Sequence, residues 1–364
     1  MSDKRLSIQQ LASDRQLRAG DDPKRLEHFG YKVFSQADED GILDEIFKRI
    51  GITNKVFVEF GVEIGEENNT RYLLEQGWTG LWIESLPAYA AEIRRRRRQD
   101  IIDGRLKFIE AKVTVENINE LIASAGIYGE IDLLSIDIDS NDYPVYEAIS
   151  VIRPRVLCIE HNPEYPPPQH YVMPYNPDYR WDYKDGSYGA SIKSLEELAE
   201  RKGMVLVGCG LYSPNGFYIR RDLVNPDLFS TPFSCERFFN ALNIDKILGF
   251  PRDEARFHQI SVQNQEQSSR QNLNGRDSTS GEKPQDVVSL KENLEKLQAQ
   301  FNHAQKTIEK RREKVKRLNM RRKKLRHKLD EAKQEIQAMK TSKFWILRTQ
   351  WFRFKRLLGL SSDR

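Results

Sequence analysis

The sequence predicts an α/β fold built on a seven-stranded sheet, with five parallel strands and a closing antiparallel pair. Between residues 55 and 220, short apolar segments alternate with helix-like segments, which is the pattern of a parallel sheet covered on both faces. The last two strand-like segments follow each other without an intervening helix. The chain of 364 residues is long enough to bury a substantial core around such a sheet.

Five apolar runs are the expected parallel strands: Val56 to Phe60, Gly80 to Glu84, Leu106 to Glu110, Ile131 to Asp137 and Arg155 to His161. Four helices are expected between them: Asn69 to Gln76, Pro87 to about Arg97, Val115 to Ser124 and Tyr143 to Val151. After a loop rich in Pro and Tyr, a helix is expected from Ser191, its N-cap, to Lys202. Met204 to Cys209 and Gly216 to Arg220 form the closing pair.

The C-terminal part departs from this pattern. Residues 261–286 are rich in Gln, Ser, Asn and Gly, which predicts disorder. From residue 287, apolar side chains follow a heptad register that only Arg311 and Arg322 interrupt, which predicts a coiled coil and a homo-oligomer through residues 287–339. The predicted segments are an N-terminal helical extension (1–27), the α/β domain (28–250), a linker (251–286), the coiled coil (287–340) and a basic amphipathic tail (341–364).

Charge is distributed unevenly along the chain. The net charge is +4, but residues 310–328 hold twelve Lys or Arg and one Glu, so the globular part is acidic. Aromatic and basic residues interleave over 342–360, which fits a helix lying on an anionic membrane surface, with a protein-docking helix as the alternative. Nucleic acid is disfavoured as a partner, because the basic stretch alternates with heptad positions.

The sequence also bears on localisation. It opens with no charged and apolar leader, and it contains no run of about 18 apolar residues. Cys158, Cys209 and Cys235 are widely spaced, which favours buried structural thiols. These features predict a cytoplasmic protein, peripheral on the inner face of the plasma membrane where the tail binds lipid.

A loop bounded by Gly61 and Gly65 follows the first strand, directly after Glu59. Glycine permits close approach of a ligand to the backbone, and the following helix start offers free N–H donors. Such glycines also make ordinary turns. Glu84, at the end of the second strand, favours ligand binding, because a carboxylate there can accept both hydroxyls of a ribose.

The loop does not match a pyrophosphate site. It lacks the Gly-x-Gly-x-x-Gly spacing, and Glu63 and Glu66 would repel phosphate. It therefore favours a cofactor that carries a ribose, an ammonium group and a sulfonium cation.

Polar side chains gather at the ends of the fourth and fifth strands: Asp137, Asp139, Asp142, Glu160 and Asn162. Ligands of open α/β sheets bind at this edge. Asp139 and Glu160 could hold Mg²⁺ through oxygen ligands. The same groups could instead bind the ammonium group of the cofactor or the hydroxyls of a sugar, and one of the aspartates could cap the following helix.

His161 could serve as a general base, because its ordinary pKa lies near neutrality and it follows the fifth strand. A buried, hydrogen-bonded structural histidine is the alternative. His170, on the Pro-rich loop, is a weaker candidate.

Several segments together resemble FkbM-like, S-adenosylmethionine-dependent methyltransferases, whose class I fold is Rossmann-like. They are Val58-Glu-Phe-Gly61, Gly65, Asn69, Leu81-Trp-Ile-Glu84, Ser135-Ile-Asp137 and Asp142-Tyr143. The stretch from Phe34 to Leu43 and the later Tyr188-Gly-Ala-Ser191 are also similar, so the resemblance covers residues 28–250. Where that family commonly has Asp-x-Gly-Ala-Asn-x-Gly, this chain has Glu59-Phe-Gly-Val-Glu-Ile-Gly.

The resemblance implies transfer of a methyl group from S-adenosylmethionine to a hydroxyl, often of a sugar or polyketide. Residues that it assigns to the cofactor are Ser35, Gln36, Glu59, Gly61, Gly65, Asn69 and Glu84. Asp137 would contact the amino-acid portion of the cofactor or the acceptor, and the remaining catalytic candidates are Asp139, Glu160 and His161.

The tail resembles a terminal segment of bacterial enzymes of surface-glycan assembly, which implies a glycan or glycolipid acceptor near the membrane. A non-catalytic scaffold that keeps the fold and oligomerises through the coiled coil is the main alternative. A nucleic-acid methyltransferase ranks last.

Overall fold

The computed structural model describes residues 6–181, 187–241, 246–247 and 249–263. The chain forms two compact units, residues 1–275 and 276–364, and all described residues belong to the first. The predicted coiled coil (287–340), the tail (341–364) and most of the predicted linker lie outside the described residues.

One mixed sheet of seven strands, in the order β3-β2-β1-β4-β5-β7-β6, organises the described unit. Strands β1 to β5 are parallel, whereas β7 runs antiparallel to both β5 and β6. The strands are β1 (Val56–Phe60), β2 (Thr79–Glu84), β3 (Leu106–Glu110), β4 (Gly129–Ile136), β5 (Ile152–Glu160), β6 (Met204–Cys209) and β7 (Asn215–Arg220). This order is typical of class I methyltransferases, so the predicted fold class is confirmed.

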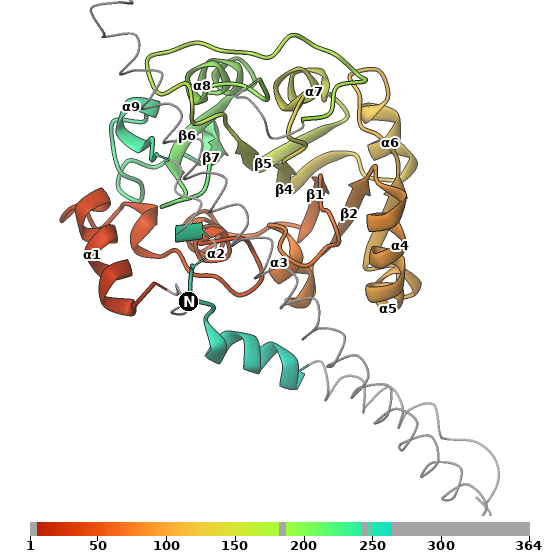
Figure 1. Ribbon diagram of the computed structural model, residues 1–364, viewed down its shortest axis with the longest axis horizontal. Helices are drawn as coiled ribbons and strands as arrows, with labels where there is room; N and C mark the ends of the chain where they lie inside the picture. Colours follow the sequence, from red (N-terminus) through yellow and green to blue (C-terminus); the bar gives the residue numbers. More distant parts are fainter. Residues whose placement is uncertain (1–5, 182–186, 242–245, 248, 264–364) are drawn as a thin grey trace, which may run out of the picture. The chain divides into compact units, whose positions relative to one another are not determined.

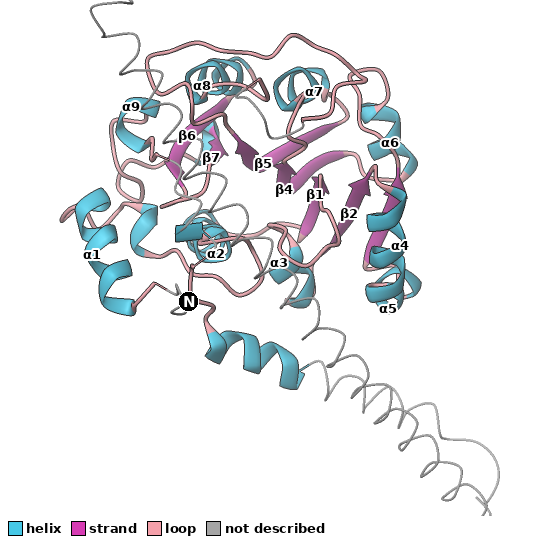
Figure 2. Cartoon of the chain, in the orientation of Figure 1, coloured by secondary structure: helices cyan, strands magenta, loops and turns pink. Residues whose placement is uncertain are grey.

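Helices cover both faces of the sheet (Figures 1 and 2). One apolar layer joins the sheet to α2, α3 and α4, and the other joins it to α6, α7, α8 and α9. Successive residues of each strand enter opposite layers, as the period of two requires: Phe57 and Trp82 face the first layer, and Val58 and Leu81 the second. The helices are α1 (Ile8–Ala19), α2 (Glu39–Ile50), α3 (Arg71–Glu75), α4 (Pro87–Arg96), α5 (Arg98–Ile102), α6 (Ile118–Ser124), α7 (Asp142–Ala148), α8 (Ile192–Arg201) and α9 (Cys235–Phe238), with short 3-10 turns η1 (Leu26–His28) and η2 (Arg221–Leu223).

Strand positions agree with the sequence prediction to within three residues, and the predicted helices are present but differ at their ends: α6 begins three residues later than predicted and α7 ends three residues earlier. The helix expected from Asn69 begins only at Arg71, because the backbone N–H groups of Asn69 and Thr70 donate to the Glu59 carboxylate. The helix expected to continue through Arg97 ends at Arg96, and α5 follows it. Ser191 is the N-cap of α8, as predicted, and its side chain accepts from the backbone N–H of Ser194.

The ordered chain continues past the predicted domain end at residue 250. Residues 254–263 are helical, and Phe257 and Ile260 pack with Phe34 and Tyr72, so the predicted linker starts with an ordered helix. The burial of aromatic surface between Phe257, Phe34 and Tyr72 stabilises this helix, which explains why the ordered chain extends past residue 250. The three cysteines are buried and free. Among the described residues, no helix combines the length and the apolarity that crossing a bilayer requires.

Candidate functional site

Two adjoining cavities open at the carboxyl edge of the parallel strands. The main cavity, of about 480 Å³, is lined among others by Glu84, Asp137, Asp139 and Glu160. The side cavity, of about 390 Å³, is lined by a different set that includes Asn69. Both volumes lie in the range of small-molecule sites. The cavities meet at the four residues that line both, namely Gln36, Gly61, Glu63 and Asp137.

The two predicted glycines have different roles. Gly61 has φ +82°, and a Cβ atom there would lie 1.5 Å from the carbonyl oxygen of Asp137, so β1 and β4 can approach only with glycine at this point. Gly65 has φ +70°, and its Cβ would lie 2.6 Å from the ring of Trp82. Gly61 therefore borders both cavities, whereas Gly65 packs on Trp82 and lines neither.

Glu59 is buried, and its carboxylate is hydrogen-bonded to the segment that follows β1. Its carboxylate accepts from the backbone N–H groups of Asn69 (2.9 Å) and Thr70 (3.1 Å), and from the side chains of Asn68, Thr70 and Ser135. These five donors exceed the roughly four acceptor positions of a carboxylate. Glu59 thus fixes the loop and Asn69, and it has no oxygen to spare for a ligand.

Glu84 keeps part of its acceptor capacity. Its Oε2 accepts from the backbone N–H of Glu63 at 2.9 Å, and its Oε1 from those of Ser85 and Leu86, each at 2.8 Å. These bonds hold the carboxylate at the wall of the main cavity. Oε1 also accepts from the Ser85 hydroxyl at 3.5 Å, whereas Oε2 has the Glu63 N–H as its one donor among the described residues. About one acceptor position therefore remains, on Oε2, which suits a single ribose hydroxyl better than the two that the sequence predicted.

The loop before α2 is shaped by a buried carboxylate. Asp40 Oδ2 accepts three backbone N–H groups, from Val33 and Phe34 at 2.7 Å and from Ser35 at 3.0 Å, and the Ser35 hydroxyl accepts from the Asp40 N–H. Ser35 is consequently buried and lines neither cavity, whereas Gln36 lines both. Of the two predicted cofactor contacts, only Gln36 faces a cavity.

Three carboxylates converge in the main cavity. Asp137, Asp139 and Glu160 each place an oxygen within 4.8 Å of the other two. No group in the described part of the chain donates a hydrogen bond to them. Asp142 differs, because it accepts from the backbone N–H groups of Ile138 at 2.9 Å and Ser140 at 3.0 Å. Asp142 therefore braces the loop, and neither Asp139 nor Asp142 is the N-cap of α7, a position that Asn141 takes.

Burial and mutual repulsion make these carboxylates weaker acids. Burial, and then the charge of Asp139, raises the pKa of Asp137, and burial followed by the charge of Asp137 raises the pKa of Glu160. Burial, Asp142 and Glu63 raise the pKa of Asp139 to about 6. Such a cluster either holds protons near neutral pH or binds a cation.

His161 lies apart from the carboxylates that the sequence grouped with it. Its ring is buried against Phe239, with centroids 5.7 Å apart, and it lines neither cavity. Burial lowers the pKa of His161 to about 3. Neither ring nitrogen has a hydrogen-bond partner among the described residues, so the side chain is buried, as the structural alternative held, but unpaired. His170 is exposed, and its Nε2 lies 2.9 Å from Glu197 Oε1.

The repulsion expected from Glu66 is absent, because this residue pairs with Arg97 at 2.9 Å and with Arg96 at 3.3 Å. Only Glu63 of the two glutamates faces the cavities without an ion-pair partner in the described part of the chain. Glu63 and the missing glycine spacing are therefore the two features that disfavour a phosphate ligand.

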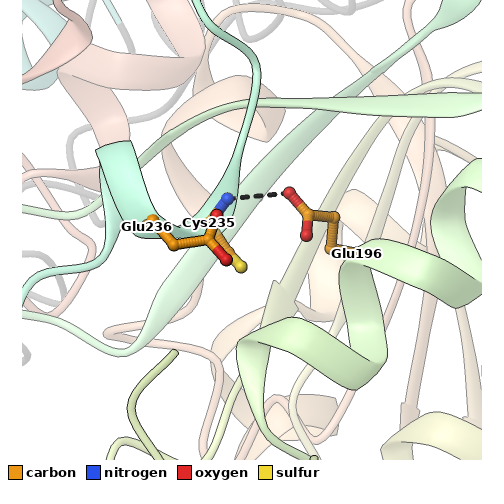
Figure 3. Close-up of side chains that lie close together, drawn as sticks. All are labelled: Glu196, Cys235 and Glu236. Carbon is orange, nitrogen blue, oxygen red and sulfur yellow. Dashed lines mark hydrogen bonds between the residues drawn. The ribbon is translucent and has the colours of Figure 1, made fainter. Parts of the chain in front are cut away.

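A second group of ligand-type side chains, Glu196, Cys235 and Glu236, lies between α8 and α9 (Figure 3). Glu196 accepts from the backbone N–H of Cys235 at 2.7 Å and pairs with Lys193 at 2.9 Å. Burial and Glu196 raise the pKa of the Cys235 thiol, which keeps it protonated. Glu196 thereby anchors α9, and its pairing with Lys193 together with the protonated thiol of Cys235 makes this group a poor metal site.

Several residues that line the cavities were not predicted from the sequence. Tyr179, Arg180 and Trp181 reach the main cavity from the Pro- and Tyr-rich loop, and Arg71 and Arg252 reach the side cavity. Only the aromatic content of the loop signals its role in the sequence. The two arginines sit in segments with no motif, so nothing in the sequence distinguishes them.

Comparison with known proteins gives similar structures only. No family model matches the chain, and no curated protein matches it. Similar solved structures include an S-adenosylmethionine-dependent methyltransferase from Clostridium acetobutylicum (12% identity, 57% of this chain and 94% of that chain, TM-score 0.32). They also include an O-methyltransferase from Bacillus cereus in complex with SAH (14%, 59% and 90%, TM-score 0.34) and a putative O-methyltransferase from Klebsiella pneumoniae (17%, 57% and 96%, TM-score 0.34). The fold assignment rests on the strand order of the sheet itself.

Proposed function

We propose that the chain is an FkbM-like, S-adenosylmethionine-dependent O-methyltransferase that acts on a hydroxyl of a sugar, glycan or glycolipid. One observation carries this proposal. Glu84, a carboxylate with spare acceptor capacity, lines one cavity together with three carboxylates that accept no hydrogen bond from the described residues. This cavity lies at the carboxyl edge of a sheet with class I methyltransferase order. Ligands of open α/β sheets bind at this edge.

The residues present fit the cofactor. Glu84 would accept a hydrogen bond from its ribose, and Leu86 and Val113 offer apolar surface in the same cavity for its adenine. Glu63 and Asp137, at the junction of the two cavities, supply negative charge for its ammonium and sulfonium groups. When bound, S-adenosylmethionine supplies an electrophilic methyl group on a positively charged sulfur.

The carboxylates would do the acid–base work. An acceptor O–H must lose its proton as its oxygen bonds to the methyl carbon and the carbon–sulfur bond breaks. Asp139 and Glu160 have raised pKa values, accept no hydrogen bond from the described residues and place oxygens within 4.8 Å of each other. They would therefore act together as one base that takes that proton from a hydroxyl held in the main cavity. We assign the proton acceptor to these two residues in place of His161, whose ring does not reach the cavity.

The same cluster fits Mg²⁺. Asp137, Asp139 and Glu160 offer three oxygen ligands with no competing donor, which is the donor chemistry that this ion prefers. A bound ion would lower the pKa of a coordinated hydroxyl. Asp137 could alternatively hold the ammonium group of the cofactor, which would leave Asp139 and Glu160 as the ligands of the ion.

The cofactor test compares calorimetric binding of S-adenosylmethionine to the wild type and to Glu84→Ala. Loss of the ribose contact is expected to weaken binding about 10- to 100-fold, the value of one hydrogen bond to a charged group. The control is Glu110→Ala: Glu110 pairs in register with Glu84 on β3 but lines neither cavity, so binding should not change. A wild type that does not bind S-adenosylmethionine would rule out the enzyme.

Mg²⁺ binding, measured by calorimetry without cofactor, should strengthen as the pH rises through about 6. Asp139 has its pKa raised to about 6 in the folded chain, so below that pH the ion must displace a proton, whereas above it the carboxylate is free. Asp139→Asn should weaken binding and flatten the pH profile. Asp103→Asn, at an exposed site whose carboxylate accepts from Gln99, is the control. Absent or pH-independent binding in the wild type would remove the metal from the proposal.

Other parts of the proposal rest on the sequence alone. Oligomerisation through residues 287–339 and membrane binding through residues 342–360 fall outside the described residues and stay predictions. The glycan or glycolipid acceptor is supported by the resemblance of the tail and by the aromatic side chains of Tyr179 and Trp181 in the main cavity.

A further inference from the structure

The side cavity contains a row of two aromatic side chains with an arginine at each end. The Arg252 guanidinium carbon lies 4.5 Å from the ring centroid of Phe257, the Phe257 and Phe34 centroids are 5.5 Å apart, and the Arg71 guanidinium carbon lies 4.4 Å from the Phe34 centroid. All four residues line the side cavity, and none lines the main cavity. Two guanidinium groups are thus held on aromatic faces beside one cavity.

The two arginines differ in how they are paired. Arg71 is buried and forms an ion pair with Glu75. Arg252 is exposed, and no carboxylate of the described residues forms an ion pair with it. Arg71 Nε has no hydrogen-bond partner among the described residues, but the charge of Arg71 is matched by Glu75. Arg252 is therefore the guanidinium of this row whose charge is left to bind an anion from the cavity. A planar guanidinium binds a carboxylate through two parallel hydrogen bonds.

Five carboxylates line the side cavity. Glu59 is occupied by its own donors, Glu66 pairs with Arg96 and Arg97, and Glu67 pairs with Lys32 at 3.3 Å, so Glu63 and Asp137 are the ones without a cationic partner among the described residues. Glu63 and Asp137 line both cavities and so stand at their junction, whereas Arg252 lines only the side cavity. The side cavity thus offers a cation-binding end and an anion-binding end. A zwitterionic α-amino acid, with its ammonium and carboxylate on one carbon, matches this pair of charges.

We propose that the side cavity takes the amino-acid portion of S-adenosylmethionine, with Arg252 binding its carboxylate. This inference rests on the proposed function and places the nucleoside in the main cavity beside Glu84. It assigns a cofactor contact to a residue that lies beyond the predicted α/β domain.

The backbone fixes Arg252 in position. Arg252 forms a β-bridge with Lys32, and the N–H of Asp253 donates to the Lys32 carbonyl at 2.6 Å. The helix over residues 254–263 then packs its Phe257 against Phe34. The segment that follows the sheet therefore completes the site.

The test compares two ligands that share a nucleoside and a thioether. S-adenosylhomocysteine carries the amino-acid portion, and 5′-methylthioadenosine lacks it. Arg252→Ala is expected to weaken calorimetric binding of S-adenosylhomocysteine about 10-fold while leaving binding of 5′-methylthioadenosine unchanged, because one charge-assisted contact is lost. Arg252→Lys should restore part of the affinity, since it keeps the charge but not the planar fork.

Arg256→Ala is the matched control. Arg256 pairs with Asp253 at 3.2 Å, stacks on Tyr31 and lines neither cavity, so binding of both ligands should match the wild type. Unchanged binding of S-adenosylhomocysteine to Arg252→Ala, or an equal loss for both ligands, would overturn the inference while leaving the proposed function intact. A wild type that binds neither ligand would overturn both.

Discussion

Replacing Glu160 with Gln, or Asp139 with Asn, is expected to slow methyl transfer by about 10²- to 10⁴-fold, the usual contribution of a general base. Each change keeps the size of the side chain and removes the group that takes the hydroxyl proton. Binding of S-adenosylmethionine should change little, because the ribose contact at Glu84 and the charges of Glu63 and Asp137 remain. The two variants thus separate catalysis from cofactor binding.

The measurement is transfer of a labelled methyl group onto an extract of cell-surface glycans, with S-adenosylmethionine binding followed in parallel. Glu164→Gln is the control, because Glu164 is exposed on the loop that follows β5, four residues after Glu160, and lines neither cavity. Variants that transfer methyl at the wild-type rate would contradict the assignment of the base. A wild type that binds S-adenosylmethionine but methylates no glycan would favour the non-catalytic scaffold.

Replacing Asp132 with Ala is expected to lower the free energy of unfolding by about 3–5 kcal/mol, the cost of leaving a buried charge without its partner. Asp132 lies at the opposite edge of the sheet from the site. Its Oδ1 accepts from Arg155 at 2.6 Å, and its Oδ2 from the backbone N–H groups of Asn54 at 2.8 Å and Lys55 at 2.7 Å. Both members of the ion pair are buried. Urea denaturation of the wild type and of Asp132→Ala measures the difference in their free energies of unfolding.

Asp222→Ala is the control for this change. Asp222 also pairs with an arginine, Arg220, at 2.6 Å, but its side chain is 61% exposed, so the loss should be about 0–1 kcal/mol. Burial raises the pKa of Asp132, but Arg155 and the backbone donors outweigh burial and hold that pKa below its ordinary value. The stabilisation is therefore present above the ordinary pKa and is lost as the pH falls below it. Equal losses of unfolding free energy for Asp132→Ala and Asp222→Ala would contradict the stabilising role of the buried ion pair.

The local sequence was sufficient for the strands. Apolar runs such as Val56–Phe60 must be buried on both faces of a parallel sheet, so their positions follow from composition alone. Helix starts were less predictable. The start of α3 depends on Glu59, which takes the N–H groups of Asn69 and Thr70 from a different element. The break after α4 occurs at Arg97, which pairs with Glu66 from the loop after β1.

Some of the cavity residues could likewise be predicted from the sequence, and others could not. Glu84, Asp137, Asp139 and Glu160 follow strands whose carboxyl ends must meet at one edge, so the sequence placed them together correctly. His161 directly follows Glu160, and the two side chains have separate environments, the cavity for Glu160 and the ring of Phe239 for His161.

What the sequence by itself determined is the sheet, its strand ends and the carboxylates that these ends bring together, because hydrophobic burial and the direction of parallel strands act locally along the chain. Only the tertiary structure decided which polar groups remain unpaired. Glu59 and Ser35 are occupied by donors and acceptors of the chain, although Glu59 borders the side cavity, whereas Glu84 keeps an acceptor position in the main cavity and Gln36 lines both cavities. The structure also brought Arg252 to the side cavity. Hydrogen bonding and ion pairing between distant segments settle these outcomes, and the spacing of residues in the sequence does not encode them.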